Sequence, residues 1–183
     1  MTLEQIIVDA LRRLERGTDT QTLKAYRRVF TTYANAAIKR IADVFEQCRK
    51  ETVDLDDEKM FAVSALSHGC WQIISIRDSK RDCYFQQDPP GSGLVRVHTL
   101  DHSVTVTYRF VPRELSATSD VPELPEFAHD LIHYYIVACA RAGGDPDTQN
   151  TASVDFQLFE SKLSRLAKST LGEPESYRLR NWW

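Results

Sequence analysis

Two histidines, His129 and His133, stand four residues apart in an apolar stretch, and this is the spacing in the chain best suited to chemistry. Residues i and i+4 share one face of a helix, so both imidazoles could bind one metal ion, as in the HExxH motif of zinc hydrolases. Here Asp130 follows the first histidine, so the glutamate that acts as general base is missing, and no third ligand follows at a recognised offset. We interpret both histidines as polar positions on a packed helix, with a small metal-dependent hydrolase as the alternative.

The other residue patterns do not assemble a catalyst or a cofactor site. The chain has no GxSxG nucleophile turn and no phosphate-binding glycine loop, because Gly91-Ser92-Gly93 is short and follows Pro90. Its four cysteines form no CxxC pair, which favours small buried residues in a reducing compartment. Lys24, Arg27 and Arg28 are typical of a solvated face, and a net charge of −3 gives no global reason for nucleic-acid binding. We expect no enzyme activity, no metal and no cofactor, and keep a regulatory DNA-binding protein as a further alternative.

Apolar residues at helical spacing predict about four helices, over about residues 2–15, 20–48, 126–142 and 148–171. Thr2 and Gln5 have the spacing of a capping box, and Asn35 interrupts an apolar seam, so its amide should hydrogen-bond a neighbouring segment. The last helix divides into an apolar stripe and a charged one. We expect Phe156, Phe159, Leu163 and Leu166 to be buried, and Glu160, Lys162, Arg165 and Lys168 to lie in water.

Over about residues 51–111 the periodicity is that of short strands. Residues 70–77 form the clearest one. Residues 52–55 and 61–63 should pair as a hairpin, and residues 94–99 should pair with 103–111 around the turn at Leu100.

Three prolines then lead the chain into the third helix. Pro112, Pro122 and Pro125 favour extended backbone before a helix start, and Gly143-Gly144 should end that helix. Its apolar residues occupy more than one stripe, which predicts burial on several sides. The predicted fold class is therefore mainly α with a β insertion. We expect a bundle of about four helices with a small antiparallel sheet inserted between helix pairs, in a single domain over residues 1–175.

A short apolar tail, residues 176–183, follows the helix stop at Gly172 to Glu175. Tyr177, Leu179, Trp182 and Trp183 have too little chain around them to build their own core, and each tryptophan could bury roughly 150–250 Å². The tail either folds back over its own bundle or docks into a partner, and we favour the partner.

Taken together, these segments resemble the head–tail connector, or adaptor, proteins of tailed bacteriophages. The second helix carries the "Y-x-N-x-A" pattern at Tyr33, Asn35 and Ala37, and ETVDL…FAVSAL…CWQIISI resembles the short strands of the family. The closest likeness is YRFVPRELSATSDVPELPE with its following helix, ending at AGGDPDT before a final amphipathic helix. The likeness covers nearly the whole chain, and the order and spacing of its segments are more specific than any one of them.

The resemblance implies a structural virion protein, made in the host bacterial cytoplasm and located in the neck at the capsid vertex. Copies would form a homo-oligomeric ring, expected to be a dodecamer, beneath the portal protein. The ring would extend the DNA channel and dock the next neck or tail component, and packaged DNA would pass through without sequence-specific binding. Another neck protein, of the head-completion or tail-terminator kind, is the runner-up.

In such connectors the C-terminal segment commonly reaches toward the portal. The partner-binding residues here would then be Tyr177, Leu179, Trp182 and Trp183, and the loop at residues 88–93 and the inserted sheet would be further candidate contacts. The chain has no apolar run of about 18 residues and no charged leader, so we expect a soluble protein with no membrane partner.

Overall fold

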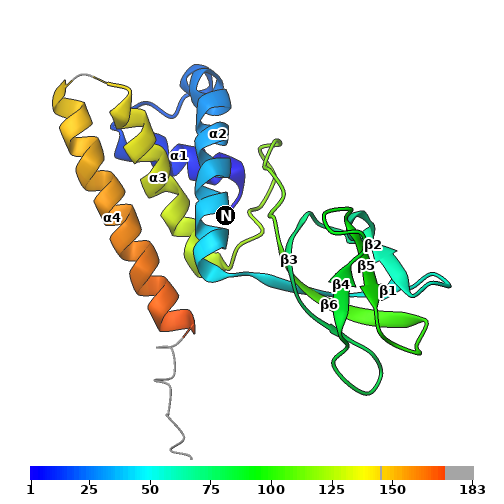
Figure 1. Cartoon of the computed structure of the whole chain (residues 1–183). Coiled ribbons are helices and arrows are strands. Elements are labelled where there is room, and N and C mark those ends of the chain that lie inside the picture. Colours follow the sequence, from blue (N-terminus) through cyan, green and yellow to red (C-terminus); the bar gives the residue numbers. More distant parts are fainter. Residues whose placement is uncertain (145, 172–183) are drawn as a thin grey trace, which may run out of the picture. The chain divides into compact units, whose positions relative to one another are not determined.

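The computed structural model describes residues 1–144 and 146–171. For residues 146–148 and 169–171 it describes the backbone but not the side chains. The chain divides into two compact units, which are described separately (Figure 1). Within the described residues, the helical unit comprises residues 1–45, 113–144 and 146–171, and the β unit comprises Glu46–Pro112.

The first two helices begin with side-chain caps. In α1 (Leu3–Arg13) the Thr2 hydroxyl accepts from the Gln5 backbone nitrogen and the Gln5 side chain accepts from the Thr2 nitrogen, at 3.4 and 2.8 Å, so the predicted capping box is confirmed. Asp19 caps α2 (Thr20–Phe45) by accepting from two backbone nitrogens at 3.0 and 3.1 Å. The prediction that this helix continues to residue 48 was wrong, because Glu46 takes a left-handed φ of 49° and a strand begins two residues later.

The third and fourth helices complete the helical unit. A short 3₁₀ turn, η2 (Glu126–Ala128), leads into α3 (His129–Ala142), which ends before Gly143 as predicted. α3 packs against α1, α2 and α4 (Pro146–Leu171), and Figure 1 shows it between α2 and α4. Burial of α3 on several sides is thereby confirmed.

The charged stripe predicted for α4 is only partly in solvent. Phe159 and Leu163 are buried as expected, and Arg165 and Lys168 are exposed. Glu160 and Lys162 are half-buried, because their charged ends turn back onto α2 and α3. Glu160 pairs with Arg40 at 3.2 Å, and the Lys162 amine lies 4.7 Å from the ring centre of Tyr134.

Asn35 joins α2 to the segment that precedes α3. Its amide nitrogen donates to the Leu115 carbonyl at 3.1 Å, and its amide oxygen accepts from the Leu115 backbone nitrogen at 2.8 Å. Both backbone groups of a loop residue are therefore satisfied by one side chain, as predicted for the amide that interrupts the seam.

The β unit contains two antiparallel sheets of three strands each. One has the order β1-β6-β3, formed by β1 (Cys48–Asp54), β6 (Ser103–Phe110) and β3 (Cys70–Arg77). The other has the order β2-β5-β4, formed by β2 (Met60–Ala62), β5 (Leu94–Val97) and β4 (Phe85–Gln87), and a 3₁₀ turn, η1 (Val63–Ala65), follows β2.

The predicted fold class was wrong: the protein is mixed α/β, and its sheets are more than a small insertion in a bundle. Side chains from both sheets and the connecting loops bury a core that is separate from the helical one. It consists of Leu55, Phe61, Leu66, Ile76, Val95, Val97, Val104, Val106 and Tyr108. Strands of three to eight residues carry weak individual signals, so the sequence pattern underestimated how much apolar surface they bury together.

Both predicted hairpins were also wrong. β1 pairs with β6 and β2 pairs with β5, so residues 52–55 and 61–63 belong to different sheets. β5 and β6, which are adjacent in the sequence, are likewise separated. The cysteines were predicted to be small buried residues, but Cys48 is exposed and the other three are half-buried, all as free thiols.

Candidate interaction surfaces

His129 is fully engaged by hydrogen bonds within the helical unit. Its Nδ1 lies 3.0 Å from the backbone nitrogen of Met1, and its Nε2 lies 3.0 Å from the Leu124 carbonyl oxygen. A carbonyl only accepts, so Nε2 carries the proton and Nδ1 accepts from Met1. With 3% of its surface exposed, His129 fastens the chain start and the segment before α3 to that helix.

His133 is equally buried, at 5% exposure, but neither of its ring nitrogens has a hydrogen-bond partner among the described residues. Burial, the largest cause, lowers the pKa of its imidazole from 6.5 to about 4, and the positive charge of Arg13 lowers it further. The ring is therefore neutral at physiological pH.

The two histidines do not form a metal site in this arrangement. Both nitrogens of His129 are used inside the protein, so the pair does not offer two lone pairs to one ion. No group of three or more potential metal-ligating side chains gathers anywhere in residues 1–144 and 146–171.

A polar cluster in the β unit contains a serine, a histidine and an acid, the residue types of a serine hydrolase, but their hydrogen bonds differ from those of a catalytic triad. Glu51 of β1 accepts hydrogen bonds from the Ser67 hydroxyl, from the Ser67 backbone nitrogen at 2.9 Å and from the Tyr108 hydroxyl at 2.6 Å. Nδ1 of His68 lies 2.8 Å from the Ser67 oxygen and 2.7 Å from Nη1 of Arg49.

These connections oppose nucleophilic catalysis at Ser67. In a serine triad the acid hydrogen-bonds the histidine and orients it, but here the Glu51 carboxylate accepts a hydrogen bond directly from the Ser67 hydroxyl. Burial alone would raise the pKa of the Glu51 carboxyl, yet hydrogen bonds from Ser67 and Tyr108 lower it to about 2, which makes it a weak base. The Ser67 hydroxyl gives its one proton to the hydrogen bond with Glu51, so it can only accept from Nδ1 of His68, which therefore carries a proton and has no lone pair for a serine proton. Arg49 donates to the other ring nitrogen, Nε2, at 2.6 Å. The cluster ties β1, β6 and the loop before β3 together.

The most exposed apolar pair on a strand of the β unit lies on β3, where the pairing with β6 shifts twice. Cys70 and Gln72 face consecutive residues of β6, as do Ile73 and Ser75, so Trp71 and Ile74 are the extra residues of two bulges. Trp71 is 60% exposed and Ile74 is 46% exposed. The predicted strand is confirmed, but the sequence pattern contained no signal for the shifts that turn these two side chains outward.

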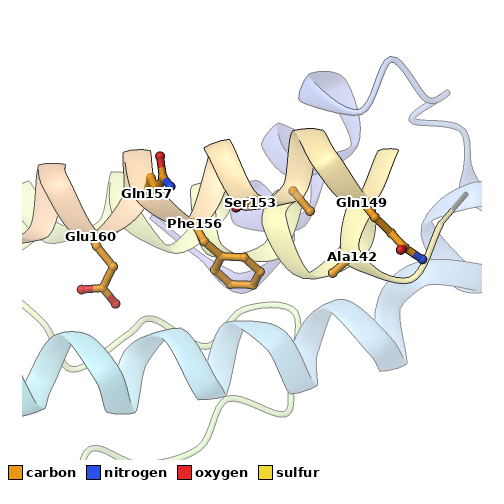
Figure 2. Close-up of a pocket in the computed structure, with 7 residues that line it drawn as sticks. Ala142, Gln149, Ser153, Phe156, Gln157 and Glu160 are labelled. Atoms are coloured by element: carbon orange, nitrogen blue, oxygen red, sulfur yellow. The ribbon is translucent and has the colours of Figure 1, made fainter. Parts of the chain in front are cut away.

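The helical unit has a second exposed apolar pair, on α4. Val154 is 61% exposed and Leu158, one turn further on, is 41% exposed. Beside them α3 and α4 form an open groove of about 590 Å³. It is lined by one residue of α3, Ala142, and by six residues of α4: Gln149, Ala152, Ser153, Phe156, Gln157 and Glu160. Figure 2 shows Phe156 and Glu160 pointing from this groove toward α2, while Gln157 points to the opposite side.

The predicted docking residues Tyr177, Leu179, Trp182 and Trp183 lie outside the described residues. The other predicted contact, the loop at residues 88–93, is mostly exposed, and Asp88 at its start pairs with Arg96 of β5 at 2.7 Å.

None of the helices that the structure describes is long and apolar enough to cross a membrane. In comparisons with known proteins, no family model and no curated protein matches this chain.

Proposed function

We propose that this protein is a non-enzymatic head–tail connector of a tailed bacteriophage, a subunit of a ring beneath the portal at the neck of the virion. One observation carries the proposal: each compact unit exposes its own apolar pair, Trp71 and Ile74 on β3 and Val154 and Leu158 on α4. Separate apolar surfaces on two units suit a part that contacts several neighbours at once.

The arrangement of the polar residues favours the same conclusion. Among the described residues, two groups have side chains that could do chemistry: the histidines of α3 and the cluster around Glu51. Both are engaged or buried in ways that oppose catalysis. The order of the sequence segments resembles that of connector proteins, and this resemblance is the reason for proposing a ring at the neck of the virion.

Roles can be assigned to the parts of the subunit. The helical unit would form the body of the ring, and the tail residues Tyr177, Leu179, Trp182 and Trp183 would bind the portal. The β unit would present Trp71 and Ile74 to the next neck or tail component. Packaged DNA would pass through the channel without sequence-specific contacts and no cofactor would be needed.

The test is co-sedimentation of the purified full chain with portal rings, followed by imaging of the complex. We expect an added ring on the portal, and deletion of residues 176–183 should abolish binding while the circular dichroism spectrum stays unchanged. A wild-type chain that does not bind portal would refute the connector assignment. A ring that binds another virion neck component would point to the head-completion or tail-terminator class.

A further inference from the structure

We infer that the β unit holds a binding site for a phosphate group joined to a planar base, the chemistry of a nucleotide, free or within a single nucleic-acid strand. The site is an open pocket of about 410 Å³, within the range of roughly 300–1,000 Å³ that is usual for small-molecule sites. Three segments line it: Glu58 and Lys59 before β2, Arg81 between β3 and β4, and residues 96–100 of β5 and the turn after it. The site goes beyond the connector role and does not depend on it.

Three basic side chains line the pocket, and each keeps N–H donors for a ligand. Arg81 is exposed, and its guanidinium has no hydrogen-bond or ion-pair partner among the described residues. Arg96 uses Nε to donate to Asp88 at 2.7 Å, which leaves its two terminal nitrogens for a ligand. The Lys59 amine has a carbonyl oxygen at 3.2 Å and a ring nitrogen at 3.4 Å, so one of its three hydrogens remains. Charged donors of this kind bind phosphate oxygens strongly.

The carboxylates beside the pocket are mostly engaged within their own loops. Asp78 accepts from two backbone nitrogens at 2.8 Å and from the Thr99 hydroxyl at 3.1 Å, and the backbone hydrogen bonds above all lower its pKa to about 2. Asp101 accepts from a further backbone nitrogen at 3.0 Å. Glu58 is the one carboxylate in the lining, and it is exposed. The lining therefore offers more free donors than free acceptors, which favours an anionic ligand.

An exposed aromatic pair beside these cations favours a ligand with a planar ring. The rings of Tyr84 and His98 lie 5.3 Å apart between centres, and the His98 backbone nitrogen donates to the Tyr84 carbonyl at 2.9 Å. His98 lines the pocket, and Tyr84 is 68% exposed. Nucleic-acid bases stack on such side chains while basic residues bind the phosphates. A bare anion has no use for an aromatic surface, and a duplex keeps the faces of its bases covered.

The test measures binding of a short fluorescein-labelled oligothymidylate to the purified full chain by fluorescence anisotropy. Arg81→Ala should weaken binding at least about tenfold, because it removes a charged donor. Tyr84→Ala should weaken it at least about fivefold through lost stacking, and Glu58→Gln should strengthen it about twofold or more. Lys50→Ala is the control: it removes a charge from β1, outside the pocket, and should leave binding unchanged. All four side chains are exposed, so the variants should fold.

Unlabelled competitors then identify the ligand. A single strand that competes better than thymidine monophosphate assigns the site to nucleic acid, and equal competition assigns it to free nucleotide. Inorganic phosphate that competes as well as thymidine monophosphate would overturn the inference, because the base would then contribute nothing. A wild-type chain that does not bind the strand, or equal losses in Arg81→Ala and Lys50→Ala, would overturn it too. Portal binding tests the connector function separately, and none of these outcomes bears on it.

Discussion

Replacing His133 with leucine should stabilise the helical unit, whereas the same change at His129 should destabilise it. The two residues share one helix and nearly equal burial, at 5% and 3% exposure. His133 buries two ring nitrogens without partners, so removing them should gain about 1–2 kcal/mol near neutral pH. Removing His129 leaves the Met1 nitrogen and the Leu124 carbonyl unpaired, which should cost about 2–4 kcal/mol.

The pH dependence gives a second measure of the same burial. The pKa of His133 is lowered to about 4 by burial first and by Arg13 and Lys162, against the opposing charges of Asp130 and Asp9. In the unfolded chain the pKa of His133 is 6.5, so between about pH 6.5 and 4 the unfolded chain binds more protons than the folded one. The free energy of unfolding therefore keeps its full value above about pH 6.5 and falls as the pH drops through this window. The total loss due to His133 is about 3 kcal/mol, of which about 2 kcal/mol occurs between pH 7 and pH 5.

Urea unfolding followed by far-ultraviolet circular dichroism would test both effects, because the described α-helices all lie in the helical unit. The difference in unfolding free energy between His133→Leu and the wild type should grow by about 2 kcal/mol from about pH 7 to about pH 5. Leucine variants that both shift the unfolding free energy in the same direction would contradict this difference between the two histidines. Equal slopes of stability with pH for the wild type and His133→Leu would contradict the lowered pKa of His133.

Three smaller perturbations follow from other contacts. Asn35→Ala should destabilise the helical unit by about 1–3 kcal/mol in urea unfolding, because both backbone groups of Leu115 lose their partner; a change below about 0.5 kcal/mol would contradict this. Glu51→Gln should reduce the loss of β-unit stability in acid, measured by the fluorescence of Trp71 in the chain without residues 176–183, where it is the one tryptophan left. The folded pKa of about 2 lies below the usual 4.5, so the Glu51 carboxylate stabilises the fold above pH 4.5, and this stabilisation is lost toward pH 2. Trp71→Ala should leave the unfolding free energy within about 0.5 kcal/mol while weakening capture of the next neck component; a large loss of stability would show that Trp71 belongs to the core.

Local signals in the sequence determined much of the secondary structure. The Thr2–Gln5 spacing placed the first helix cap, Gly143 marked the end of α3, and β-branched and apolar residues identified β3. Each of these features depends on atoms within a few residues of one another, so the sequence pattern alone is informative. The hydrogen bonding of the Asn35 amide was also predictable, because a polar group in an apolar seam needs a partner.

Only the tertiary structure decided which strands pair and which side chains reach the surface. β6 lies between β1 and β3, where its side chains Val104, Val106 and Tyr108 are buried in the core of the β unit. The pattern of short strands in the sequence does not specify pairing partners that are so distant in the chain. The two bulges that expose Trp71 and Ile74 arise from that pairing.

The same holds for the spacing of His129 and His133. The sequence favoured polar positions on a packed helix and left a metal pair as the alternative. Helix packing settled the contacts of each ring, because it engaged one histidine and left the other without a partner among the described residues. Residue types and spacing determined what chemistry was conceivable. The packing of distant segments determined which groups remained available for it, because burial and hydrogen bonding depend on neighbours that are remote in the chain.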